Sequence, residues 1–144
     1  MGADLARFVA SGKIELARRD VEMGDLVREA VDLVLPLVVL RKQVLVLDIS
    51  EGLVVNVDAS RMTVALERLL TNVVKLSASA SRLVVTTRTH ASRVVVTVTS
   101  STLPANLSLE DLAVGFVAQL CEIEGGALLL TPGQLRVMLP HQSQ

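Results

Sequence analysis

The fold of this chain is most constrained by residues 61–104. This stretch begins with a helical run at 61–77, in which apolar residues recur at spacings of three and four. Two runs of alternating apolar and polar residues follow at 81–89 and 93–99, joined by the short polar segment 90–92. The pattern predicts an amphipathic helix followed by an antiparallel β-hairpin, both contributing to one core.

The composition predicts one domain with an aliphatic core. Of the 144 residues, 51% are hydrophobic but only 1% are aromatic, namely Phe8 and Phe116. The net charge of -1, without a basic block or an aromatic platform, argues against a nucleic-acid partner. The single Cys121 cannot form an internal disulfide and has no metal-ligand spacing around it.

The hydropathy of the chain raises the question of a membrane segment. Its mean hydropathy is +0.54. The best apolar run, residues 33–40, contains Pro36 and is much shorter than the roughly 20 residues that a spanning helix needs. The opening residues show no signal-peptide pattern. We therefore expect a cytoplasmic protein with no direct membrane insertion.

The residues before the central stretch predict four further elements and the end of a fifth. The expected elements are the end of a helix at 3–10, an edge strand at 13–21, a helix from Gly24, and strands at 43–49 and 53–57. Pro36 should kink or end the helix that starts at Gly24. The turn at 50–52 predicts that the two strands around it pair antiparallel. Asp58 is placed to cap the central helix.

The residues after the central stretch predict a last helix and a closing hairpin. Ser108 and Asp111 have the spacing of a capping box, and the helix should run from there to about Glu124 and stop at Gly125. The two strands of the hairpin are expected at 127–131 and 134–139.

Together these elements predict an α+β fold, a two-layer α/β sandwich. Its helices pack on one face of a mixed, mostly antiparallel sheet. Residues 1–12 are interpreted as the end of a preceding helix or a linker, 13–140 as the domain, and 141–144 as a tail. On this interpretation the chain is a fragment of a longer protein.

The order of the motifs resembles the catalytic, ATP-binding domain of bacterial sensor histidine kinases, a Bergerat-type ATPase fold also present in gyrase and heat-shock chaperones. Residues 58–62 lead into Leu69-Leu-Thr-Asn72-Val-Val-Lys75, as they do before and within the N box of that family. Residues 93–98 resemble the strand that enters the first glycine box. Residues 111–118 and 122–126 resemble the second glycine box, its helix and the end of that helix.

The first glycine box departs from the family's pattern. Active members carry an Asp that accepts the adenine amino group, and by alignment Ser100 stands in its place. A serine hydroxyl is a weaker acceptor with a shorter reach. The family's glycines fall on Thr102 and Pro104, which stiffen the backbone. The earlier asparagine of the N box corresponds to Arg68.

The second glycine box and the lid depart from the family as well. Asp111 and Ala113 stand at glycine positions, and the short connector from Ser100 to Asp111 leaves little room for a mobile lid. Asn72, the Mg²⁺ ligand of the family, is one oxygen ligand and makes a poor metal site without phosphates. We therefore expect no cofactor, no catalytic residue, no metal site and no productive binding of ATP and Mg²⁺. The vestigial nucleotide face comprises Asn72, Lys75, Arg68 and Ser100.

The connector is expected to fill the former site with its own apolar side chains. The candidates are Leu103, Pro104, Leu107 and Leu112. The leading hypothesis is a pseudokinase-type module of a two-component signalling protein that acts through protein–protein interaction. The resemblance implies three partners: a kinase dimerisation domain, a response-regulator receiver domain, or a second copy in a homodimer. The alternatives are a divergent but active ATP-binding histidine kinase catalytic domain and a small-ligand sensor.

Overall fold

The structure is a computed structural model that describes residues 16–142. The expected helix end at 3–10 and the first residues of the expected edge strand lie outside the described residues. The elements are β1 (Arg18–Glu22), α2 (Met23–Leu40), β2 (Val44–Ile49), β3 (Val54–Asp58), α3 (Ala59–Leu76), β4 (Arg82–His90), β5 (Arg93–Ser100), α4 (Gly115–Ile123), β6 (Ala127–Thr131) and β7 (Gln134–Pro140).

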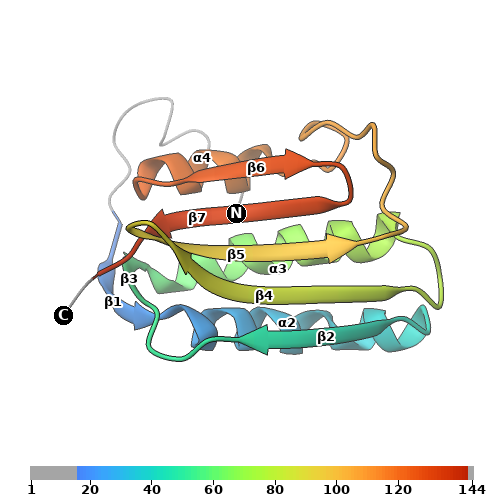
Figure 1. Ribbon diagram of the computed structural model, residues 1–144, viewed down its shortest axis with the longest axis horizontal. Helices are drawn as coiled ribbons and strands as arrows, with labels where there is room; N and C mark the ends of the chain where they lie inside the picture. Colours follow the sequence, from blue (N-terminus) through green and yellow to red (C-terminus); the bar gives the residue numbers. More distant parts are fainter. Residues whose placement is uncertain (1–15, 143–144) are drawn as a thin grey trace.

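The described elements form two layers (Figure 1). The main sheet has the strand order β2-β4-β5-β7-β6, and only the β2–β4 pair is parallel. The helices α2, α3 and α4 lie on one face of this sheet, behind it in Figure 1. A second, two-stranded sheet of β1 and β3 lies at one end. The predicted two-layer sandwich with a mixed, mostly antiparallel sheet is confirmed.

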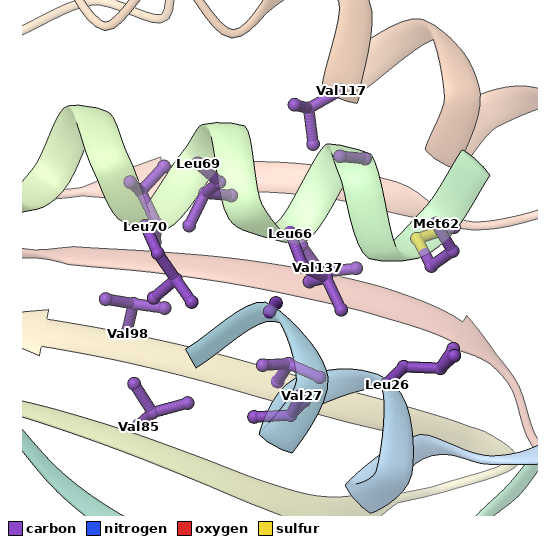
Figure 2. Close-up of a cluster of buried hydrophobic side chains, with 14 of the residues drawn as sticks. Leu26, Val27, Met62, Leu66, Leu69, Leu70, Val85, Val98, Val117 and Val137 are labelled. Carbon is purple, nitrogen blue, oxygen red and sulfur yellow. The ribbon is translucent and has the colours of Figure 1, made fainter. Parts of the chain in front are cut away.

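The core between the layers is aliphatic, as the composition predicts. Figure 2 shows side chains of α3, among them Leu66 and Leu70, pointing toward Val98 and Val137 of the sheet. Alternate residues of β4 and β5 enter this core, and Val85 is fully buried. Period-two alternation in the strands and the spacing of three and four in α3 therefore meet in one apolar layer.

The predicted pairing of the strands at 43–49 and 53–57 is wrong. β2 pairs in parallel with β4, whereas β3 pairs antiparallel with β1 in the other sheet. Parallel neighbours need a long crossover connection, which β3 and α3 supply between β2 and β4. The turn at Gly52, whose φ is +78°, redirects the chain into the small sheet and does not close a hairpin.

The predictions for two helices can be compared with the structure. Of the two effects predicted for Pro36, an end of the helix is wrong, because α2 continues to Leu40. Pro36 and Asp32, the residue four positions earlier, are both exposed, so water can solvate the carbonyl that loses its partner. The last helix begins at Gly115 and not at Ser108, because Ala113 has φ +54°, a conformation that an α-helix does not contain. Its end at Gly125 is confirmed, with φ +84° there.

Candidate functional site

The helix α3 positions three of the four predicted site residues. Asp58 caps its first turn by accepting a hydrogen bond from the Arg61 backbone N–H at 3.0 Å, as predicted. The core face of the helix is buried. Beside that face, Arg68 and Lys75 are exposed and Asn72 is half-buried. The spacing of three and four residues places these polar side chains in one stripe along α3.

Asn72 is engaged with the connector between β5 and α4. Its side-chain Nδ2 donates a hydrogen bond to the backbone carbonyl of Leu112. The Leu112 side chain is buried, with 1% of its surface exposed. One amide group of Asn72 therefore holds a segment 40 positions further along the chain against α3.

The two cations of the stripe have different surroundings. The Arg68 guanidinium lies over the ring of Phe116, 5.9 Å from its centroid, which is the geometry of a cation–π contact. Lys75 is exposed in the last turn of α3, where a positive charge interacts favourably with the helix dipole. Among the described residues neither cation is paired with a carboxylate.

Ser100, the fourth predicted site residue, lies in a different environment. It ends β5 and is buried, with 1% of its surface exposed. Its hydroxyl shares a hydrogen bond of 2.7 Å with the hydroxyl of Ser77, the C-cap residue that follows α3. The Thr102 hydroxyl lies 3.3 Å from Ser100 Oγ and accepts a hydrogen bond from the Ala78 backbone N–H. This chain of hydroxyls joins the end of α3 to the connector, and it does not reach Asn72.

The connector itself places apolar side chains in the core. Leu103, Leu112 and Val114 are buried, whereas Leu107 is half-buried and Pro104 is exposed. Of the four residues expected to fill this region, Leu103 and Leu112 are therefore part of the core, Leu107 packs against it, and Pro104 does not.

A turn near Asp111 gives the connector a fixed shape. Ser108 and Asp111 exchange two hydrogen bonds between backbone N–H groups and side-chain oxygens, at 2.8 and 3.1 Å. The hydrogen bond from the Ser108 backbone, followed by that from its hydroxyl, lowers the pKa of Asp111. The predicted capping-box contacts are thus present, but they close a turn before α4 and do not cap the helix.

The open depression beside Ser100 contains none of the α3 stripe. It is lined by residues of β5, the connector and the β6–β7 turn: Thr99, Ser100, Ser101, Leu103, Ala105, Pro132, Gly133 and Gln134. Between residues 16 and 142 there is no group of three His, Cys, Asp or Glu side chains able to hold a metal ion. This depression therefore brings Ser100 together with residues of the connector and the β6–β7 turn, but not with Arg68, Asn72 or Lys75.

Sequence reasoning missed a polar junction at the other end of α3. The buried Glu124 carboxylate bonds the Arg18 Nε at 2.7 Å with one oxygen and accepts the Asp58 backbone N–H at 2.7 Å with the other. Asp58 also accepts the Ala17 backbone N–H at 3.0 Å. The junction ties β1, β3 and α4 together. Its members are far apart in the chain, so no local spacing could have indicated it.

Cys121 is a buried residue of α4. Burial, and then the negative charges of Glu124 and Glu122, raise the pKa of its thiol to about 12. The thiol is therefore neutral at physiological pH and unsuited to act as a nucleophile.

In the part of the chain that the structure describes, no helix is long and apolar enough to cross a membrane.

Comparisons of sequence with known proteins found no match. No family model matches the chain, and no curated protein sequence matches it.

Several solved structures share the fold. The histidine kinase AdeS of Acinetobacter baumannii has a TM-score of 0.83 at 14% identity, covering 99% of this chain and 76% of that one. The nucleotide-free catalytic domain of histidine kinase ThkA has a TM-score of 0.75 at 16% identity, covering 87% and 96%. ThkA in complex with the response regulator protein TrrA has a TM-score of 0.77 at 16% identity, covering 97% and 47%. The chain has the fold of the catalytic domains of sensor histidine kinases.

Proposed function

We propose that the chain is a pseudokinase-type module of a two-component signalling protein. It keeps the histidine kinase ATPase fold, does not bind ATP productively, and acts in the cytoplasm through protein–protein contacts. The observation that carries the proposal is the hydrogen bond from Asn72 to the Leu112 carbonyl. Through its Nδ2 the Asn72 side chain holds the connector against α3, and leucines of this connector are part of the core, in the region where a nucleotide's phosphates would need room.

The surroundings of Ser100 support the same proposal. An adenine amino group needs an accessible acceptor, whereas the Ser100 hydroxyl lies in a chain of hydroxyls with Ser77 and Thr102. Ser100 is also buried, so a base could reach it only if the end of β5 moved. A base that reached Ser100 would have to disturb this chain of hydrogen bonds, each of which contributes about 1 kcal/mol.

The proposed partners are a response-regulator receiver domain or a kinase dimerisation domain. ThkA, which has this fold, has been seen with a response regulator protein. In this chain the exposed cations Arg68 and Lys75 lie on α3 beside the connector and offer two positive charges to a partner. Charged groups at the rim of an interface mainly set its specificity and association rate.

Titration calorimetry with receiver and dimerisation domains from the same genome tests the proposal. We expect one of them to bind, and Lys75→Glu to weaken that binding by about fivefold, equivalent to roughly 1 kcal/mol. Arg19→Glu is the matched control, because Arg19 is an exposed cation on β1. Binding of none of these domains, or equal loss in both variants, would contradict this choice of partner and surface.

A further inference from the structure

The strand β2 presents an open edge of the main sheet. It stands at the end of the strand order, and within residues 16–142 its only neighbour in that sheet is β4. The Val44 N–H donates to the Ser81 carbonyl at 3.0 Å on the β4 side. Successive residues of a strand point their N–H and C=O groups to opposite sides, so those of Leu45, Leu47 and Ile49 point away from β4.

This edge has few of the features that normally prevent pairing with another chain. Edge strands are usually protected by lysines, prolines or bulges. β2 reads VLVLDI, and its one charged residue, Asp48, bonds Arg88 of β4 at 2.6 Å. Val44 and Leu47 are 58% and 38% exposed. The strand is therefore an apolar edge with unpaired backbone groups.

The helix α2 extends the apolar surface above this edge. A Cβ atom placed on Gly24 would lie 2.8 Å from a methyl carbon of Ile49, so the start of α2 lies directly on β2. Figure 1 shows α2 and β2 together at the same border of the molecule. Leu35 follows Gly24 by three helical turns on the same side of α2, with Val39 one turn beyond. These two residues are 39% and 71% exposed.

Exposed charged residues lie at both ends of β2. The exposed Lys42 precedes the strand. At the other end Asp48 pairs with Arg88 at 2.6 Å, and Glu51, whose side chain is 83% exposed, pairs with Arg28 at 3.6 Å. When two copies of β2 pair antiparallel, Lys42 of each lies beside the exposed Glu51 carboxylate of the other, which it would share with Arg28. The strand is thus complementary to itself in backbone groups and apolar side chains, and Lys42 and Glu51 add one pair of opposite charges.

We propose that this surface, Leu35, Val39, Val44 and Leu47 (the α2–β2 edge), binds a second copy of the chain. The two β2 strands pair antiparallel about a two-fold axis perpendicular to the sheet, and both helix layers lie on the same side. Such a symmetric contact closes on itself and gives a dimer. The proposal does not depend on the state of the nucleotide face.

Sedimentation velocity of the full chain at increasing micromolar concentrations tests the dimer. We expect a species of twice the 15.4 kDa chain mass. Leu47→Lys should convert this dimer to monomer. Leu47 is paired in register with the buried Val85, so its side chain is on the face of the sheet that the helices cover. A lysine there would place a charge within the contact between the two copies. Leu129→Lys is the matched control on the opposite edge strand, where Leu129 is 45% exposed, and should leave the mass unchanged. A chain that stays monomeric, or a dimer that only Leu129→Lys dissociates, would overturn the proposal.

A charge exchange serves as a second test if Leu47→Lys fails to fold. Lys42→Glu should weaken the dimer severalfold, and the double variant Lys42→Glu with Glu51→Lys should restore it. Hydrogen exchange supplies a local readout: the amides of Leu45, Leu47 and Ile49 should exchange more slowly as the concentration rises. Unchanged exchange at these amides in a dimeric sample would place the contact elsewhere and refute the proposal.

Discussion

The connector between β5 and α4 and the α2–β2 edge differ in whether their polar groups have partners within the chain. At the connector, polar groups of Asn72 and Ser100 bond to other parts of the chain, and Leu112 is buried. At the edge, backbone groups of β2 point outward and Val39 is 71% exposed. Within residues 16–142, internal hydrogen bonds therefore hold the connector in place, whereas the outward-pointing backbone groups of β2 are available to a partner.

The largest expected effect comes from removing a buried side chain of the connector. Leu112→Ala should lower the free energy of unfolding by about 3 kcal/mol, because it leaves a cavity in a packed core. Val39→Ala, at the exposed edge, should change it by less than about 0.5 kcal/mol. Urea denaturation measures both. Equal costs would show that the connector is not packed as a core element.

A smaller effect is expected for the amide that holds the connector. Asn72→Ala should cost about 1–2 kcal/mol, because the Leu112 carbonyl loses its donor. Lys75→Ala, one turn along the same stripe, should stay within about 0.5 kcal/mol. Thermal unfolding of the two variants provides the comparison. A neutral Asn72→Ala would mean that the amide does not fasten the connector.

The smallest expected effect is a pH dependence at Cys121, which is buried in α4 beyond the connector. Its pKa is raised from 9.0 to about 12, so the folded state favours the neutral thiol and its stabilisation is lost as pH rises above about 9. Wild-type stability should therefore fall between pH 9 and pH 10 more steeply than that of Cys121→Ala. A thiol reagent should label Cys121 only on unfolding. Rapid labelling of the folded protein would show that this region opens.

The sequence predicted the elements whose signal is local. The alternation in β4 and β5 and the cap at Asp58 depend on neighbouring residues, and both were found where expected. The pairing of β2 could not be read in this way, because its partner β4 lies beyond α3. The delayed start of α4 depends on the left-handed conformation of Ala113, a residue type that rarely adopts it.

The candidate site shows the same limit. The polar stripe of α3 followed from spacing, and the burial of Leu103 and Leu112 followed from their apolar character in a short connector. The partners of Ser100 and Glu124 did not follow, because each contact joins residues far apart in the chain. The spacing of residues indicates which side chains share a helix face, but not which distant groups they contact.

Calorimetric titration of the full chain with ATP and Mg²⁺ tests the central claim most directly. We expect no measurable heat of binding at micromolar concentrations, for the wild type and for Asn72→Ala alike, because the connector is held against α3 by Asn72 and Ser100 is buried. Micromolar binding that is lost in Asn72→Ala would contradict the account and establish a working nucleotide site on α3.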